Sequence, residues 1–353
     1  MAPDFDPADA IYRQLAALLR TQIYNGQIRG KIPGLRELAQ EYSINIKTAN
    51  KAIGLLVAEG LLFRVRGKGT FVRKVAESAT DTLCGLVVPN VTNPYFARTA
   101  QAIEEQGFGR GIAFLVNATG ATPEKLFHIL AMYRSRGIQL AVVHGGSLRD
   151  PGSLERAMES GLHLIGIHTH SNEIDDVWPD VRAGAQLAAD HLLENFGGPL
   201  AFVSGSDDPI RETGRFVGYR DALLSYGLEP EPRYLIETAP TYRGGFEAVE
   251  QLAQLGDLPR AVLFYNQVMA MGGINALRSR GIRIPDDVAV VGIDDGVDEE
   301  HMLVPTTAIS FPFEIAARQV LTLIRRRLES PGAETRSIRL IPKIVIRESS
   351  TPG

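Results

Sequence analysis

Residues 1 to 74 change from helical to strand-like hydrophobic spacing. Apolar residues recur every three or four positions from Ile11 to Ile23, which predicts an amphipathic helix. Two more helices are predicted over 34–43 and 45–60, joined by the short turn "YSIN", the length of a helix-turn-helix connection. After Gly60, "LLFRVRGKGTFVRK" predicts two short strands around a glycine-containing loop. These elements predict a small α+β domain.

From Leu83 onward, short apolar segments alternate with longer amphipathic stretches. Strands are expected at segments such as "LCGLVVP", "LAVVHG", "HLIGIH" and "VAVVGID". This alternation predicts right-handed βαβ units and parallel sheets flanked by helices. A second series of strands starts near Pro199, which predicts two lobes. The intervening helices are expected over 97–107, 124–136, 183–196, 214–226, 242–255 and 268–280.

The boundary between the two regions is expected at a small, polar segment. Residues 75–82, "VAESATDT", show no hydrophobic period and are predicted to be a linker. The expected organisation is therefore a first domain over 1–74, a linker over 75–82 and a two-lobed α/β domain over 83–350.

Charge is unevenly distributed between these regions. Residues 1–74 contain 12 basic and 6 acidic residues, whereas the remainder contains 25 basic and 35 acidic residues. A basic first domain on an acidic body is typical of a nucleic-acid-binding module attached to a domain that does not bind nucleic acid.

The third predicted helix carries polar side chains suited to the major groove of DNA. Lys47, Thr48, Asn50 and Lys51 lie near its start, with apolar residues between them. In the hairpin, glycines allow close approach to the DNA backbone, and Arg66 and Lys68 supply charge. The alternative is that these are solvated charges on a small helical domain.

Residues 10–74 resemble the winged helix-turn-helix of the GntR family of bacterial transcription regulators. The resemblance rests on "PGLRELAQEYSINIKTANKAIGLLVAEGLLFRVRGKGTFV". One difference is that Asn45 and Ile46 replace the family's usual Ser-Arg pair, so its base preference does not carry over. The resemblance implies a DNA-facing set of Arg36, Lys47, Thr48, Asn50, Lys51, Arg66, Lys68, Gly69 and Thr70.

Residues 82–350 resemble the regulatory domain of the LacI/GalR family, which is similar to periplasmic sugar-binding proteins. The matching segments include "LCGLVVPNVTNPYFARTAQAIEEQ", "GRFVGYRDALLSYGL" and "IPKIVIRES". A GntR head on such a body is the architecture of the arabinose-repressor type of regulator. The resemblance and the strand-end positions imply an effector site containing Tyr95, Phe96, Asn117, His168, Arg215, Asn266, Asp294 and Phe311.

Three features of the body have alternative interpretations. His168 and His170 form an H-x-H pair that could bind zinc, although no third ligand accompanies it and polar lining of the cleft is favoured. Trp178 is either a stacking platform or a residue packed at the hinge. Gln267 replaces the acidic residue usual in the family at that loop. No metal or other cofactor is expected.

The sequence therefore predicts a DNA-binding transcription regulator, with repression as the expected mode. A small carbohydrate bound between the lobes is expected to control the affinity of a homodimer for double-stranded operator DNA. An enzyme is not expected, because no P-loop or G-x-S-x-G motif occurs and "GFGRG" at 107–111 precedes a strand. The alternative is a carbohydrate-binding protein or enzyme with a non-specific basic module.

The expected compartment is the cytoplasm. The start of the chain has no secretory signal pattern, and no apolar run has the length of a membrane span. The single cysteine, Cys84, is predicted to be a buried strand residue, as suits a reducing compartment.

Overall fold

The chain divides into two compact units, Met1–Asp81 and Thr82–Gly353. The computed structural model describes residues 10–24, 28, 30–59, 61–65, 68–72, 82–120, 122, 124–148, 150, 152–205, 214–298 and 301–352. Of the expected linker, only Thr82 lies within the described residues, and it begins the first strand of the second unit.

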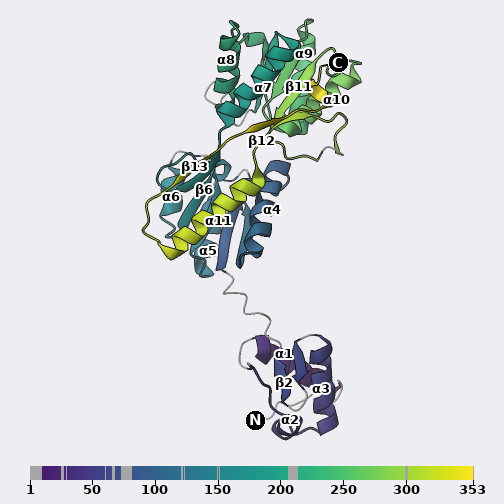
Figure 1. The fold of residues 1–353 in the computed structure, drawn as a ribbon, viewed down its shortest axis with the longest axis vertical. Helices are drawn as coiled ribbons and strands as arrows, with labels where there is room; N and C mark the ends of the chain where they lie inside the picture. The colour runs from purple at the N-terminus through teal and green to yellow at the C-terminus, as the bar shows by residue number, and fades with distance from the viewer. Residues whose placement is uncertain are drawn as a thin grey trace. The chain divides into compact units, whose positions relative to one another are not determined.

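The amino-terminal unit is built from three helices and a hairpin (Figure 1). α1 (Ile11–Tyr24), α2 (Leu35–Glu41) and α3 (Ile46–Ala58) enclose a single apolar core that includes Leu15, Leu38 and Leu56. β1 (Leu62–Val65) pairs antiparallel with β2 (Gly69–Val72), and a bridge between Lys31 and Phe71 extends this sheet. The three predicted helices and the hairpin are confirmed.

The first lobe of the second unit is a fully parallel six-stranded sheet in the order β13-β7-β6-β5-β3-β4. Helices α4 (Pro94–Phe108) and α11 (Phe313–Glu329) cover one face, and α5 (Glu124–Ser135) and α6 (Ser153–Met158) cover the other. The strands are β3 (Thr82–Val88), β4 (Ile112–Ala118), β5 (Leu140–His144), β6 (His163–Ile167), β7 (Asp175–Pro179) and β13 (Ser337–Leu340).

The second lobe repeats this plan with strand order β14-β12-β11-β10-β8-β9. Helices α7 (Val181–Phe196) and α8 (Gly214–Ser225) cover one face, and α9 (Tyr242–Gln254) and α10 (Gln267–Ser279) cover the other. Only β14 runs antiparallel to its neighbour within the described sheet. The strands are β8 (Leu200–Gly205), β9 (Leu235–Thr238), β10 (Ala261–Phe264), β11 (Ala289–Ile293), β12 (Thr307–Ser310) and β14 (Lys343–Val345). Two lobes of parallel sheets flanked by helices are thus confirmed.

The chain passes between the lobes three times, and the two later passages, through α11 and β13, were not predicted from the sequence. The second lobe was expected to begin near Pro199, but it begins earlier in the chain, because α7 already packs in its core. After β12, α11 returns to lie beside α4 in the first lobe, as Figure 1 shows, and β13 joins the first sheet before β14 joins the second. Each lobe is therefore assembled from segments far apart in the sequence.

Within the described part of the chain, no helix has both the length and the apolar character needed to cross a membrane.

Candidate functional sites

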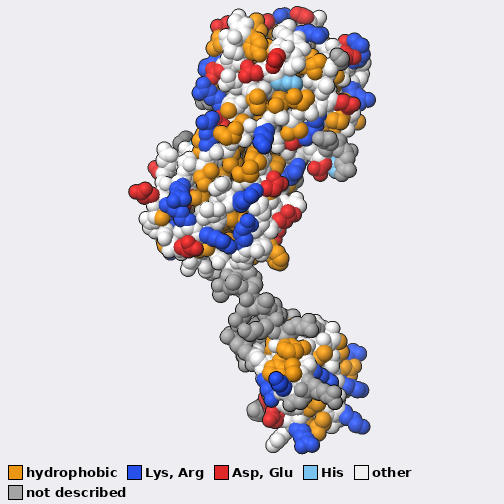
Figure 2. All heavy atoms as spheres, viewed as in Figure 1, with side chains coloured by type: hydrophobic (Ala, Val, Ile, Leu, Met, Phe, Trp, Pro, Cys, Tyr) orange, Lys and Arg blue, Asp and Glu red, His pale blue; other side chains and the backbone are white. Residues whose placement is uncertain are grey.

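Helix α3 presents one polar face and one apolar face. Its start is fixed by Asn45, whose side chain accepts a hydrogen bond from the Thr48 amide at 2.7 Å. The buried side, which includes Ala49 and Ile53, packs in the core of the amino-terminal unit. Lys47, Asn50 and Lys51 are exposed, and Thr48 is half-buried. Figure 2 shows Lys and Arg side chains spread over the visible surface of this unit.

The hairpin supports the polar face of α3. Arg64 of β1 donates a hydrogen bond from Nη2 to Asn50 Oδ1 at 2.8 Å, which fixes the orientation of the amide. Lys68 is exposed at the turn before β2. Gly69 has φ 118°, and a Cβ there would lie 2.8 Å from Lys31 Cε, so only glycine is suited to this position.

The remaining members of the DNA-facing set occupy different environments. Arg36 is exposed in the first turn of α2, whose start is held by a 2.7 Å hydrogen bond from the Gly34 amide to Glu37. Thr70 is half-buried, and its carbonyl accepts a hydrogen bond from the Ile32 amide, so its backbone belongs to the sheet. Arg66 lies outside the described residues.

A cavity of about 730 Å³ opens between the two lobes of the second unit. The first lobe contributes the turn after β6 and the strands β7 and β13, and the second lobe contributes the starts of α7 and α8. Of the predicted effector residues, His168 and Arg215 line this cavity. Its position beyond strand ends is where ligands of open parallel sheets bind.

Arg215 is the buried charge at one end of the cavity. Its Nη2 lies 3.2 Å from Asp294 Oδ2, and its guanidinium lies 4.2 Å from the centre of the Tyr265 ring. Burial raises the pKa of Asp294, and Arg215 opposes that shift. Burial also raises the pKa of Tyr95, and Asp294 adds to the increase, so the tyrosine hydroxyl remains protonated. The charge pair and the hydroxyl offer both hydrogen-bond donors and acceptors.

His168 and His170 are presented by a turn that the Asp176 carboxylate holds. The Thr169 and His170 amides donate hydrogen bonds to Asp176 at 3.2 and 2.8 Å. Both histidines have positive φ values, 61° and 54°, a conformation that non-glycine residues rarely adopt. Asp176 is fully buried, and its two hydrogen bonds stabilise this unusual turn.

His144, at the end of β5, lies beside this turn. Its ring centre is 4.9 Å from Phe96 and 5.9 Å from His168. Burial, with a contribution from Arg215, lowers the pKa of His144 to about 3. Burial, with contributions from His144, Arg215 and His170, lowers the pKa of His168. Both imidazoles are neutral near pH 7. Since the Gly146 amide donates to His144 Nδ1, the proton of the neutral ring is on Nε2.

The other predicted effector residues do not line this cavity. Asn266 is buried and caps α10 by accepting a hydrogen bond from the Met269 amide at 2.8 Å. Phe311 is 3% exposed in the core of the second lobe. The buried Oδ1 of Asn117 has no hydrogen-bond partner among the described residues. Gln267 accepts from the Gly296 and Val297 amides and thereby holds the loop after β11.

Several cavity residues were absent from the predicted effector set. Trp178 and Arg339 come from the neighbouring strands β7 and β13, where they are directly paired. Asp180 forms an ion pair with Arg339 and caps α7 through the Ala183 amide at 2.9 Å. Asp180 could have been predicted from the sequence, because an Asp directly after a strand is a typical helix cap. The pairing of β7 with β13 could not, because no local pattern in the sequence indicates it.

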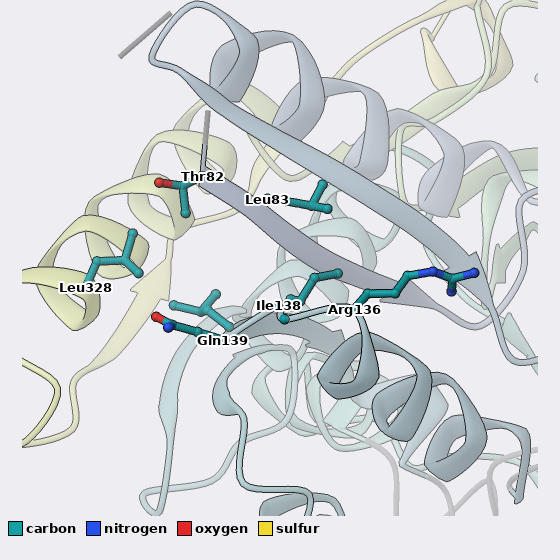
Figure 3. Close-up of a pocket in the computed structure, with 8 residues that line it drawn as sticks. Thr82, Leu83, Arg136, Ile138, Gln139 and Leu328 are labelled. Atoms are coloured by element: carbon teal, nitrogen blue, oxygen red, sulfur yellow. The ribbon is translucent and has the colours of Figure 1, made fainter. Parts of the chain in front are cut away.

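A smaller cavity of about 140 Å³ lies at the opposite ends of the first-lobe strands (Figure 3). Thr82 and Leu140, at the starts of β3 and β5, and Leu328 of α11 line it. It lies away from the carboxyl ends of the strands, where ligands of parallel sheets bind. Among the described residues, no group of three or more His, Cys, Asp and Glu side chains could hold a metal ion.

Comparison with protein-family models finds one match in each unit. Residues 11–72 match the model described as bacterial regulatory proteins, gntR family. Residues 189–350 match the model described as a periplasmic binding protein-like domain.

Similar proteins include transcription regulators from several bacteria. The HTH-type transcriptional repressor PurR of Mannheimia succiniciproducens is 27% identical over 272 residues, which cover 76% of this chain and 81% of PurR. The HTH-type transcriptional regulator DegA of Bacillus subtilis is 26% identical over 276 residues, which cover 76% of this chain and 81% of DegA.

Solved structures of transcriptional regulators, one of them described as LacI family, share the fold. A regulator from Enterococcus faecium with bound ribose superimposes with a TM-score of 0.67 at 23% identity, over 77% of this chain and 99% of that chain. A CelR–cellobiose complex superimposes with a TM-score of 0.66 at 23% identity, over 90% and 100% of the two chains. The chain is therefore similar to bacterial gntR-family regulatory proteins over residues 11–72 and to periplasmic binding protein-like domains over residues 189–350, and its second unit has the fold of the solved regulators.

Proposed function

We propose that this protein is a transcriptional repressor that binds operator DNA through its amino-terminal unit and responds to a small carbohydrate bound between the lobes of its second unit. The observation that carries this proposal is the buried Arg215–Asp294 pair beside an inter-lobe cavity. Paired charged groups of this kind can bind adjacent sugar hydroxyls through several directed hydrogen bonds. The cellobiose and ribose named for two structural neighbours support a carbohydrate as the ligand class.

DNA is proposed to meet α3 in the major groove and the hairpin at the backbone. The exposed Lys47, Asn50 and Lys51 form the reading face, and Lys68 provides a phosphate contact. A homodimer would present two such units to two half-sites. Closure of the cleft around the effector is proposed to change the dimer geometry, with a coupling free energy of about 1 to 3 kcal/mol.

Selection of bound duplexes from random DNA, followed by binding assays over a salt series, tests this function. The selected duplex should bind at least about 10³-fold more tightly than a scrambled one. Affinity should fall with salt with a log–log slope of about −0.9 per phosphate contacted. Equal affinity for both duplexes would favour the alternative, a carbohydrate-binding protein or enzyme with a non-specific basic module.

Replacement of Arg215 tests the effector site. Arg215→Lys keeps the charge that faces Asp294 but removes the planar fork, so effector affinity should fall about tenfold or more. DNA affinity without effector should stay unchanged. Calorimetry and operator binding measure the two quantities, with Arg243→Lys on the exposed face of α9 as the matched control. Unchanged effector affinity in Arg215→Lys would contradict the assignment.

A further inference from the structure

The inter-lobe cavity has two chemically different ends. Arg215, at the start of α8, lies at the end near its ion-pair partner Asp294. Trp178, His170 and Arg339 lie at the end formed by β7, the turn after β6 and the edge strand β13. The first end offers directed polar groups, and the second is dominated by ring surfaces.

Trp178 offers the cavity a ring surface. Its only hydrogen-bond donor, Nε1, already donates to Ser337 Oγ at 2.8 Å. The indole is half-buried, with the His170 ring centre 5.0 Å away and the Arg339 guanidinium 6.0 Å from its centre. These neighbours hold the ring in place at the cavity wall. A fixed indole without a free donor is suited to stacking on the apolar face of a sugar ring.

The volume of the cavity is larger than one sugar ring would fill. At roughly 30 Å³ per water molecule, 730 Å³ corresponds to about 24 water-sized volumes. A hexose has about 12 non-hydrogen atoms and a disaccharide about 23, so the larger ligand matches the space better.

The charged groups of the cavity are already paired. Arg339 faces Asp180, Arg182 lies 2.6 Å from Asp221, and Arg215 lies 3.2 Å from Asp294. A neutral ligand leaves these ion pairs in place, whereas an anionic one would compete with the carboxylates for the same guanidinium groups.

We infer that the effector is a neutral two-ring carbohydrate, with one ring held at Arg215 and Asp294 and the other stacked on Trp178. This inference rests on the proposed carbohydrate response. It assigns Trp178 as the residue that determines ligand size, through contact with the outer ring.

Trp178 is the only tryptophan in the sequence, so its fluorescence reports directly on the outer end of the cavity. The full chain is titrated with cellobiose, maltose, lactose, xylobiose and trehalose, with glucose, galactose and xylose, and with glucuronate as an anionic sugar, by calorimetry and fluorescence. One disaccharide should bind at least about tenfold more tightly than its component sugars, change the emission of Trp178 and protect it from acrylamide quenching.

Substitutions at Trp178 distinguish stacking on the indole from binding elsewhere in the cavity. Trp178→Ala should weaken disaccharide binding about tenfold or more, with monosaccharide affinity changed less than about twofold. Trp178→Phe should keep disaccharide affinity within about threefold, because a ring face remains. If Trp178→Ala does not fold, quenching protection in the unaltered protein and the Phe variant decide the question.

The inference is overturned if a monosaccharide binds as tightly as every disaccharide, if Trp178→Ala leaves disaccharide affinity unchanged, or if only anionic sugars bind. Operator release is scored separately. A disaccharide that binds at Trp178 without changing operator affinity would support the site and refute the regulatory function. A monosaccharide that releases operator DNA without changing the fluorescence of Trp178 would support the regulatory function and refute the site.

Discussion

Backbone conformation at individual residues marks the inter-lobe site. Among the described non-glycine residues, positive φ occurs at Ser43, His168, His170 and Asp294, and the last three belong to the inter-lobe site. Such conformations cost of order 1 to 3 kcal/mol each and persist only where the surroundings fix them. Here Asp176 holds the histidine turn and Arg215 pairs with Asp294. These contacts hold the unusual backbone geometry in the absence of a ligand.

The neutral His144 should make stability depend on pH. The folded pKa is about 3 and the ordinary value is 6.5, so between these values the unfolded chain binds a proton that the folded chain does not. Stability should therefore fall as pH drops from 6.5 toward 3, by up to about 1.4 kcal/mol per pH unit from this group. His144→Asn should weaken this dependence in urea unfolding measured at pH 7, 6 and 5, because the contribution of the buried His168 remains.

The matched control is His128→Asn, on the exposed face of α5, which should keep the pH dependence of the unaltered protein. An equal slope in the His144 variant and the unaltered protein would contradict the role given to burial.

Among the secondary-structure elements, α3 and the hairpin of β1 and β2 form one connected surface of the amino-terminal unit. The hydrogen bond from Arg64 to Asn50 joins a strand to the exposed face of the helix. The cap at Asn45 and the apolar face of α3 were readable from sequence, because both depend on neighbours within a few positions. The link from Arg64 to Asn50 was not readable, since it depends on how the hairpin folds back.

Substitutions in these two elements should affect DNA binding differently. Lys68→Ala should weaken binding to all duplexes similarly and reduce the salt slope by about 1. Asn50→Ala should cost about 1 to 3 kcal/mol on the selected operator and little on scrambled DNA. Fluorescence anisotropy over a salt series measures both, with Lys125→Ala on α5 as the control. If both variants bind every duplex like the unaltered protein, α3 and the hairpin do not contact DNA.

At the scale of the whole second unit, a buried charge pair fixes the return of the chain to the first lobe. Asp175 is fully buried in β7, with Arg327 of α11 at 2.5 Å and Arg326 at 3.3 Å. The Arg336 amide, just before β13, donates to the same carboxylate at 2.8 Å. One carboxylate thus joins β7, α11 and the segment that leads into β13.

Removal of this carboxylate should destabilise the second unit strongly. Asp175→Ala leaves Arg327 buried without its partner, which typically costs about 3 to 5 kcal/mol. Urea unfolding followed by far-ultraviolet circular dichroism measures the loss. Asp286→Ala, which removes an exposed carboxylate near Arg283, should leave the transition unchanged. Equal midpoints for the two variants would show that the pair does not hold the lobe together.

By itself, the sequence determined what depends on local periodicity and capping: the three helices and hairpin of the first unit, and the alternating strands and helices of the second. The resemblance to the LacI/GalR regulatory domain pointed to Arg215 and His168 as effector residues, and both line the inter-lobe cavity. Helix α11 was missed, although Phe313, Ala317 and Leu321 show a helical period.

Only the tertiary structure decided which segments share a lobe. The pairing of Trp178 with Arg339 and the ion pair between Asp175 and Arg327 join residues more than 150 positions apart. Such contacts depend on the path of the whole chain, and no window of sequence carries that information. For the same reason, the burial of Phe311 and the capping role of Asn266 emerged only when the lobes were assembled.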